Sequence, residues 1–394
     1  MTVRTAATHT YTPSTGAPVY AVIQAAAATE RVWGYTPEAR ARRMLDKMGI
    51  AGVVSQGQPW PGEGTVILLS GEAVFDEAVL EGLLERPGVA VTDRQGFEVL
   101  AAHVPADRAP EAAAWLGHLP PRDENVEVLP PRAVANTYRG GLRKRTNPVC
   151  RRVRPGQTHA AERGLYDAAY KGVTDLITKW VWPAPAFWVT RACARLGITP
   201  NMVTLASAVL VALAIWLFGT GAYGWGLLAA WTMTFLDTVD GKLARVTLTS
   251  STFGDIFDHV IDLVHPPIWY AAWGIGLGAA GAALPANWLM PIIWIIVLGY
   301  IGGRVCEGWF LSRFGLEIHV WERFDSRFRL ITARRNPNLV LLTGFWLAGR
   351  PDWGLLAVAA WHVASDAVHL VRIAQAEAVR SRGKVLTSWL RSAV

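Results

Sequence analysis

The chain has 394 residues, a formal net charge of +7 and 52% hydrophobic residues, but only 18% charged residues. Soluble domains contain about 25% charged residues, so this composition excludes a disordered chain and argues against a purely soluble one. Three cysteines far apart in the sequence, Cys150, Cys193 and Cys306, exclude a disulfide scaffold. A basic excess on an apolar chain favours an anionic membrane surface or phosphate-bearing substrates as partners, rather than nucleic acid.

Composition divides the chain into segments. Residues 1–17 are rich in Thr, Ala and Pro, lack the apolar run of a secretory signal peptide and are expected to be disordered. We predict a soluble, cytoplasmic α/β domain at 18–135, a basic linker with interfacial helices at 136–200, a helical membrane domain at 201–375 and a basic cytoplasmic tail at 376–394.

Short apolar strands alternate with helices in the front domain. We predict strands at 18–23, 53–54, 66–69, 89–92 and 97–103, and helices at 36–49 and 73–85. For the first helix, Thr36 is the expected N-cap, Pro37 suits the first turn and Gly49 marks the end. This alternation predicts a Rossmann-like α/β layer.

The front domain lacks one feature of nucleotide-binding layers. A phosphate cradle needs backbone N–H groups without obstructing Cβ atoms, yet the turn at 24–31 contains no glycine. The domain nevertheless resembles the sugar- or alcohol-phosphate nucleotidyltransferases, and residues 67–75 resemble their metal-site strand, with Glu72 where Asp is usual. We therefore expect a non-catalytic domain used in folding or assembly, and a membrane part that works without it.

Apolar runs long enough for a bilayer begin at Val203. About 20 residues are needed to cross, and six spans are predicted, of which the fifth is short: 203–219, 223–240, 255–276, 287–310, 338–348 and 353–372. The loop after the fourth span and the tail are rich in arginine, whereas the turns at 220–222 and 277–286 contain no Lys or Arg. The positive-inside rule predicts that both termini lie in the cytoplasm. The protein is expected to be an integral protein of the cytoplasmic (inner) membrane.

The segment 162–196, before the first span, mixes aromatic and basic residues. Trp180, Trp182, Phe187 and Trp188 alternate with cations, which suits the headgroup layer of a bilayer. Pro183 and Pro185 are expected to break this segment into two interfacial helices.

Acidic residues stand inside the predicted membrane helices. The second and third spans carry Asp237, Asp240, Asp255, Asp258 and Asp262. Because ionisable groups in a membrane are costly unless paired or hydrated, these are candidates for function. Helical periodicity places Asp237 and Asp240 on one arc, and Asp258 and Asp262 on one face of the next helix. Two facing helices would gather four carboxylates, and such oxygen ligands suit Mg²⁺ or Mn²⁺.

The same residues carry a resemblance to a known family. The pattern Asp237-x2-Asp240-Gly241-x2-Ala244-Arg245-x8-Gly254-x3-Asp258-x3-Asp262 matches the signature of the CDP-alcohol phosphotransferases, also called phosphatidyltransferases. The likeness extends over about 165–375 and implies a transferase of phospholipid biosynthesis. Such an enzyme moves a substituted phosphate from a CDP-alcohol, such as CDP-diacylglycerol, to an acceptor hydroxyl and releases CMP. The resemblance also implies a homodimer.

The resemblance implies a role for each signature residue. Asp237, Asp240, Asp258 and Asp262 would bind two divalent metals, and Asp262 would also act as the base that takes the acceptor proton. The residues implied at the nucleotide site are Asp240, Gly241, Ala244, Arg245 and Gly254. The physics agrees, because two metals at a diphosphate neutralise the leaving CMP and polarise the attacked phosphorus.

The acceptor is less clearly indicated. Candidate residues for an acceptor or its phosphate are Arg304, Arg323, Arg327, Arg329, Arg334, Arg335 and His259. Arginine forks bind phosphate, but a basic cytoplasmic loop that touches anionic headgroups explains the arginines equally. Two other functions stay open for the whole chain: a divalent-metal transporter, and a catalytically inactive membrane scaffold.

Overall fold

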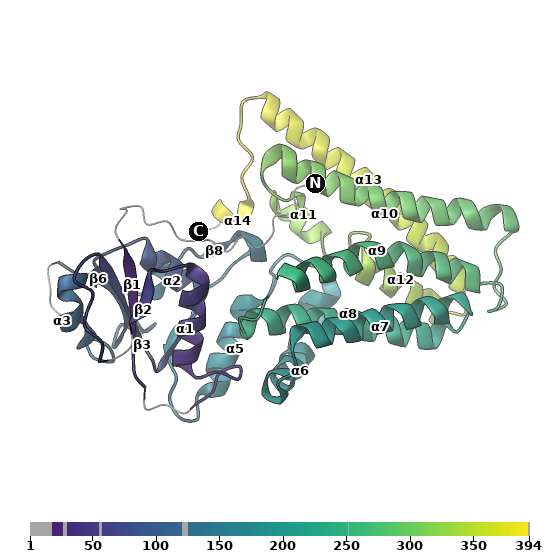
Figure 1. The fold of residues 1–394 in the computed structure, drawn as a ribbon. Helices are drawn as coiled ribbons and strands as arrows, with labels where there is room; N and C mark the ends of the chain where they lie inside the picture. Colours follow the sequence, from purple (N-terminus) through teal and green to yellow (C-terminus); the bar gives the residue numbers. More distant parts are fainter. Residues whose placement is uncertain (1–17, 27–29, 55–56, 120–124, 251, 393–394) are drawn as a thin grey trace.

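The computed structural model describes residues 18–392 apart from 27–29, 55–56, 120–124 and 251, and gives only the backbone at Thr252, Phe253, Asp255, Asp258, Ala286 and Ser392. An α/β part is followed along the chain by a helical part, and the two pack side by side (Figure 1). The predicted disordered segment 1–17 lies outside the described residues.

A six-stranded mixed sheet forms the centre of the α/β part, in the order β2-β1-β3-β6-β5-β7. Its strands are β1 (Val19–Gln24), β2 (Gly52–Val54), β3 (Thr65–Ser70), β5 (Val89–Thr92), β6 (Val99–Pro105) and β7 (Glu127–Leu129). Strand β6 runs antiparallel to β3 and β5, while the other pairs are parallel. Alternate side chains of β3 enter two cores, Ile67 and Leu69 on one face and Val66 and Leu68 on the other, because both faces are covered.

The first helix, α1 (Pro37–Met48), confirms the predicted boundaries. Thr36 Oγ1 accepts the Ala39 amide at 3.2 Å, and Gly49 ends the helix in the left-handed region with φ 67°. Helix α1 and α2 (Glu77–Leu84) cover the face that contains Ile67, while α3 (Ala109–Ala113) covers the other.

The prediction of one helix over 73–85 is wrong in its first part. Residues Ala73–Phe75 form strand β4, and α2 begins only after Asp76, whose side chain caps the Val79 amide at 3.1 Å. Strand β4 pairs antiparallel with β10 (Cys150–Arg152), a partner that local periodicity cannot reveal. The α/β part therefore continues beyond residue 135. Its remaining elements are η1 (Ala106–Arg108), α4 (Pro131–Val134), β8 (Tyr138–Arg139), η2 (Gly140–Leu142) and β9 (Lys144–Arg145).

The basic, aromatic segment forms α5 (Thr158–Ala169), a π-helical turn η3 (Ile177–Val181) and α6 (Pro183–Leu196), which begins at the predicted break. Its aromatic residues divide between two environments. Trp180 and Trp188 are exposed, whereas Phe187 is buried against Trp33 and Tyr166. The segment therefore packs on the front domain as well as presenting aromatic rings outward.

The helical part contains α7 (Pro200–Gly219), α8 (Tyr223–Val246), α9 (Thr252–Gly276), α10 (Ala286–Phe314), η4 (Ile318–Val320), α11 (Arg323–Phe328), α12 (Arg335–Leu347), α13 (Pro351–Ser381) and α14 (Trp389–Ser392). Within the described residues, three helices are long and apolar enough to cross a membrane: α7, residues Asn287–Phe314 of α10, and α13. Helix α12 has only 13 residues, fewer than the roughly 20 that a crossing needs. Six crossings therefore remain a prediction.

The C-terminal ends of helices α7 and α9 are in close contact. A Cβ atom on Gly276, the last residue of α9, would fall on the carbonyl oxygen of Phe218 in α7. Small residues allow this kind of approach between helices in a bilayer. Phe218 also packs on Trp269 and Trp273 of α9, so the contact lies at the edge of the helical core.

We predict that Gly276→Ala destabilises the helical part by about 1–3 kcal/mol, the usual cost of overpacking. Thermal unfolding of the full chain in detergent measures the effect as a lower Tm. Gly278→Ala is the matched control, because a Cβ atom at Gly278 meets nothing within 4 Å. Equal Tm values for the two variants would contradict the close contact.

Candidate active site

The predicted acids lie on two helices joined by a short turn. Asp237 and Asp240 are on α8, and Asp258 and Asp262 are on α9. The side chain of Asp258 lies outside the described part of the structure, as does that of Asp255. The observed geometry of the acids therefore rests on Asp237, Asp240 and Asp262.

One arginine from a third helix joins the acids of α8 and α9. Arg335, the first residue of α12, donates from Nη2 to Asp237 Oδ2 and from Nη1 to Asp262 Oδ1, both at 2.5 Å. Its side chain is only 15% exposed. The sequence placed Arg335 among acceptor candidates, whereas the structure places its guanidinium between two signature carboxylates.

Asp240 is held from a fourth helix. Its side chain is buried, Oδ2 accepts the Thr204 hydroxyl of α7 at 2.8 Å, and Oδ1 accepts the Gly241 amide at 2.5 Å. Asp237 and Asp262 are its electrostatic neighbours. Three carboxylates thus gather near one guanidinium, an excess of negative charge that further cations would relieve. Oxygen-only donors suit Mg²⁺ or Mn²⁺, so the donor set fits the implied metals.

The small residues of the signature line the same end of α8. The guanidinium of Arg245 folds back over Gly241, and a Cβ atom there would lie 3.3 Å from Arg245 Nη2. Arg245 also lines a cavity of about 90 Å³ at the boundary with the front domain. Ala244 lies next to Arg245 on α8, and Gly254 lies in the first turn of α9. The predicted nucleotide residues therefore lie at the ends of α8 and α9 that meet at the turn.

The acceptor candidates do not form one group. Arg304, Arg329 and Arg334 are electrostatic neighbours around Glu307. By contrast, Arg323 lies over the Trp389 ring at 5.4 Å, and Arg327 and His259 are exposed. The structure thus separates three arginines that surround a partly buried carboxylate from the other candidates.

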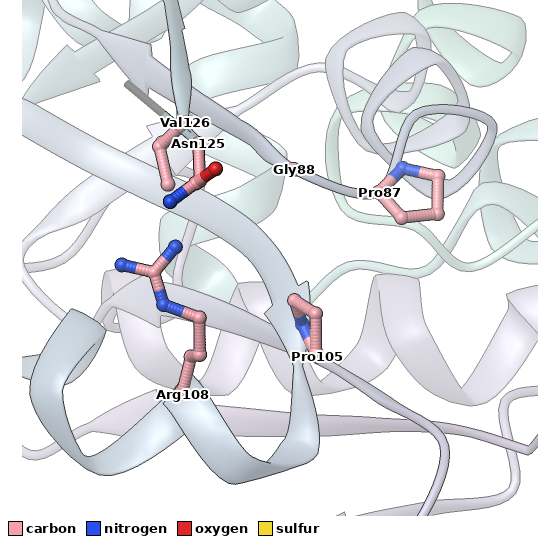
Figure 2. A pocket seen from close by; sticks show the side chains of 6 residues that line it. All are labelled: Pro87, Gly88, Pro105, Arg108, Asn125 and Val126. Atoms are coloured by element: carbon pink, nitrogen blue, oxygen red, sulfur yellow. The ribbon is translucent and has the colours of Figure 1, made fainter. Parts of the chain in front are cut away.

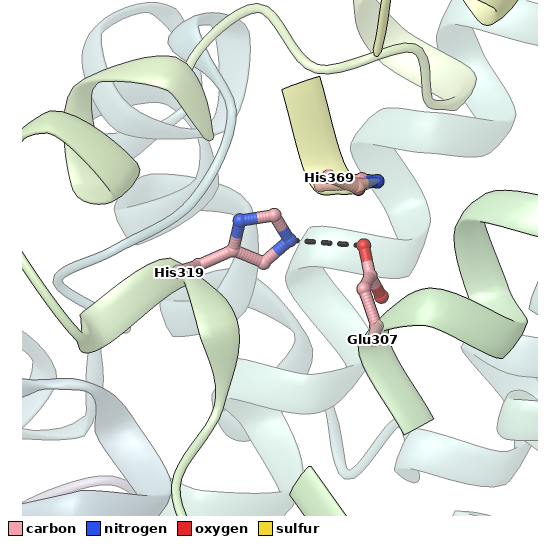
Figure 3. A group of neighbouring side chains, drawn as sticks. All are labelled: Glu307, His319 and His369. Atoms are coloured by element: carbon pink, nitrogen blue, oxygen red, sulfur yellow. Dashed lines mark hydrogen bonds and ion pairs between the residues drawn. The ribbon is translucent and has the colours of Figure 1, made fainter. Parts of the chain in front are cut away.

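Glu307 of α10 is the centre of that group, and Figure 3 shows it beside His319 and His369. Its carboxylate accepts from Arg304 Nη2 at 3.2 Å and from His319 Nε2 at 2.9 Å, and it pairs with Arg334. Burial holds the pKa of His319 well below its usual range, so the ring is neutral. Sequence analysis missed Glu307, although an acid inside the apolar span 287–310 was a usable signal.

Glu307, His319 and His369 also present ligand atoms within 4.8 Å of one another, a spacing that a metal ion would accept. However, Arg304 and Arg334 already neutralise the carboxylate. A divalent cation beside two guanidiniums is electrostatically unfavourable. We therefore interpret this group as an ion-pair network that holds the arginines.

A second carboxylate that sequence analysis missed, that of Asp175, binds the start of α12. Asp175 accepts from the Thr178 amide at 3.0 Å, the Thr178 hydroxyl at 2.8 Å and Asn336 Nδ2 at 3.0 Å. Burial raises the pKa of Asp175, but the Arg329 guanidinium and these donors outweigh it and hold the pKa below its usual value. The consecutive residues Arg334, Arg335 and Asn336 are therefore each tied to a different carboxylate group.

Two features of the front domain bear on the predicted nucleotide site. Glu72 is paired with Arg152, whose Nε lies 2.6 Å from Glu72 Oε2. The glycine-free turn lies partly outside the described residues, at 27–29. A pocket between the starts of β5 and β7 and the end of β6 is lined by Pro87, Gly88, Pro105, Arg108, Asn125 and Val126 (Figure 2). Open α/β sheets bind ligands at the carboxyl ends of their parallel strands, and this pocket is at the opposite edge.

Comparisons with known proteins agree with the signature. Residues 197–325 match the sequence profile of the CDP-alcohol phosphatidyltransferase family. The chain is similar to a phosphatidylinositol phosphate synthase of Mycobacteroides abscessus, with 32% identity over 123 residues, which are 29% of this chain and 54% of the relative. It thus spans about half the length of that relative.

Two further relatives extend the likeness. A phosphatidylinositol phosphate synthase of Corynebacterium glutamicum is 26% identical over 187 residues, which cover 46% of this chain and 78% of the relative. A bifunctional IPC transferase and DIPP synthase of Rubrobacter xylanophilus is 29% identical over 170 residues, which cover 41% of this chain and 34% of the relative. The acids on α8 and α9 lie inside the matched segment, whereas Arg335 lies outside it. Residues 197–325 of the chain therefore form a CDP-alcohol phosphatidyltransferase domain.

Proposed function

We propose that this protein transfers a substituted phosphate from a CDP-alcohol to an acceptor hydroxyl and releases CMP. The observation that carries the proposal is the convergence of Asp237 and Asp262, from two helices, on a single guanidinium. In the reaction, the acceptor oxygen forms a bond to the phosphorus that bears the alcohol. The bond from that phosphorus to the bridging oxygen breaks, and this oxygen leaves as part of CMP.

Asp237, Asp240 and Asp258 would hold the divalent metals, with Asp262 beside them. When bound, these ions would neutralise the diphosphate and polarise the attacked phosphorus. Gly241 has no side chain and Ala244 only a methyl group, so these residues would leave space for the nucleotide beside the carboxylates. Arg245 and the backbone at Gly254 border that space, with Arg245 supplying positive charge for phosphate oxygens.

Asp262 would take the proton of the acceptor. Its side chain is 38% exposed, and Arg335 engages only Oδ1. The Tyr300 hydroxyl donates to the Asp262 backbone carbonyl at 3.1 Å and holds this part of α9 against α10. The acceptor hydroxyl loses its proton to the carboxylate as the new bond to phosphorus forms.

The arginines around Glu307 favour a phosphorylated acceptor. Several of their nitrogens are buried without a hydrogen-bond partner among the described residues: Arg304 Nε, Arg329 Nε and Nη1, and Arg334 Nε. Three guanidiniums face the carboxylates of Glu307 and Asp175, which leaves surplus positive charge for an anion.

The arginine group lies next to Asp262. Arg304 lies over the Tyr300 ring, with 5.6 Å from Cζ to the ring centroid, and the Tyr300 hydroxyl bonds to Asp262. An alcohol phosphate held there would present a hydroxyl toward Asp262. Two relatives are named phosphatidylinositol phosphate synthases. On that basis, inositol phosphate is the proposed acceptor and CDP-diacylglycerol the proposed donor.

The remaining parts of the proposal concern the membrane. Six crossings, with both termini in the cytoplasm, would place the signature acids at the inner membrane surface, where soluble substrates have access. We also propose a homodimer, from the family resemblance. A divalent-metal transporter or an inactive scaffold remains the alternative for the same carboxylates.

The test of function is CMP release by the full chain in lipid nanodiscs. The protein is incubated with a panel of CDP-alcohols and acceptors, including CDP-diacylglycerol with inositol phosphate, and lipid products are identified by mass spectrometry. We expect CMP release that requires Mg²⁺ or Mn²⁺, with one donor and acceptor pair preferred. Folded protein that releases no CMP from any donor would favour the transporter or the scaffold.

We predict that Asp262→Asn keeps donor binding but loses turnover. Removal of a general base costs about 10²–10⁴-fold in rate, so single-turnover CMP release should fall by that factor. Asp240→Asn is the comparison, because this buried residue contributes to donor and metal binding. Equal loss of donor affinity in both variants would make Asp262 mainly a ligand.

For the acceptor, we predict that Arg329→Gln raises the KM for a phosphorylated acceptor about tenfold or more, as expected for loss of a charged hydrogen bond. The KM for the same alcohol without phosphate should stay within about twofold, because the lost bond is to phosphate. Arg327→Gln, at an exposed position of α11 two residues earlier, is the control. An equal effect on both acceptors would remove Arg329 from the acceptor site.

A further inference from the structure

The turn that joins the two acid-bearing helices is held by the front domain. Arg40 of α1 is buried, and its Nη1 donates to the carbonyl of Val246, the last residue of α8. The last carbonyls of a helix have no partner within the helix. A guanidinium there satisfies one of them and also suits the negative end of the helix dipole.

One face of α1 is directed to this turn. Arg43 donates to the Thr247 carbonyl at 3.5 Å, and Lys47 donates to the Ser250 hydroxyl at 3.3 Å. With Arg40, these cations recur at the three- and four-residue spacing that puts side chains on one side of a helix. This face of α1 thus follows the turn from Val246 to Ser250.

Leu248 occupies a backbone conformation that favours glycine. Its φ is 57°, and the left-handed region costs a non-glycine residue about 1–2 kcal/mol. The Thr249 amide donates to the Ala244 carbonyl at 2.9 Å and the Leu248 amide to the Arg245 carbonyl at 3.4 Å. These bonds are those of a Schellman cap, in which glycine usually stands at the position of Leu248.

The side chain of Leu248 accounts for this exception. It is 6% exposed and belongs to the hydrophobic core of the front domain, with Met44 and Leu45 of α1. A second core is shared as well, because Val32 and Trp33 of the front domain pack with Leu243 and Val246 of α8. The end of α8 is therefore built into the front domain on two sides.

We propose that the front domain is a clamp that sets the position of α8 relative to α9, with Arg40 and Leu248 as positioning residues for the signature carboxylates. The proposal rests on the proposed function only in assigning these carboxylates to catalysis. The cap closes on Ala244 and Arg245, which are themselves signature residues, so movement of the turn displaces the nucleotide site. The proposal departs from the expectation that the membrane part works without the front domain.

The variant Leu248→Gly distinguishes the contribution of the front domain to the turn from the contribution of the local helix cap. Glycine relieves the left-handed strain and keeps the cap, but it removes the side chain from the front-domain core. A turn that depends on its cap alone would be unchanged or tighter in this variant. A turn held by the front domain would loosen.

The experiment uses the full chain in nanodiscs, with wild type, Leu248→Gly, Arg40→Ala and Arg40→Lys. The control is Arg42→Ala, on the same helix, whose exposed guanidinium lies 4.0 Å from Glu38. Hydrogen exchange is measured at residues 246–250, and exchange at strands β1 and β3 reports whether the front domain stays folded. CMP release is followed against Mg²⁺ concentration.

We expect Leu248→Gly and Arg40→Ala to speed exchange at 246–250 and to lower kcat, each by on the order of tenfold or more, the scale expected for misplaced catalytic groups. Both should raise the Mg²⁺ concentration for half-maximal rate, Arg40→Lys should recover part of each effect, and Arg42→Ala should match wild type. Wild-type exchange at 246–250 in both variants would overturn the clamp, as would faster exchange with unchanged CMP release. If wild type releases no CMP, the proposed function fails, and the exchange data alone decide whether the front domain holds the turn.

Discussion

Ionised carboxylates on apolar helices are stable only next to positive charge. The Arg335 guanidinium provides that charge for Asp237 and Asp262. The position of Arg335 depends in turn on its neighbours in sequence. Arg334 pairs with Glu307 of α10, and Asn336 bonds to Asp175 in the segment before η3. The start of α12 is thus a junction that ties α8, α9, α10 and the connecting segment together.

This junction explains why a helix of 13 residues has a place in a membrane protein. Its first turn supplies polar groups to buried partners, and Asn338 continues inward with bonds to Tyr270 and His362 at 3.0 Å. A longer apolar helix could fill the same space but could not neutralise acids on two other helices. In the proposed reaction, the divalent metals would act at these same carboxylates, beside the Arg335 guanidinium.

The proposed donor and acceptor parts of the site lie on neighbouring elements. The acids and the nucleotide residues lie at the ends of α8 and α9, where the front domain holds the turn through Arg40 and Leu248. The arginines proposed for the acceptor lie around Glu307, next to Tyr300. Donor and acceptor would therefore approach Asp262 from different sides.

Sequence alone located the features that depend on spacing along one helix. The arcs of Asp237 with Asp240, and the caps of α1 at Thr36 and Gly49, follow from local periodicity and capping chemistry. Features that depend on distant pairing were not predictable in this way. Strand β4 forms because residues 150–152 pair with it, and Arg335 reaches the acids only through the packing of α12 against α8 and α9. The positioning role of Leu248 could not be predicted, because leucine is not a residue type that indicates a left-handed backbone.

Metal binding by the signature carboxylates is measured most directly with Mn²⁺, by electron paramagnetic resonance of the full chain in nanodiscs without substrate. If Asp237 and its neighbours hold cations in place of the Arg335 guanidinium, wild-type protein binds Mn²⁺ at saturable sites and Asp237→Asn loses that binding. An Asp237→Asn protein that binds as much Mn²⁺ as wild type, with the same affinity, would contradict a metal site between α8 and α9.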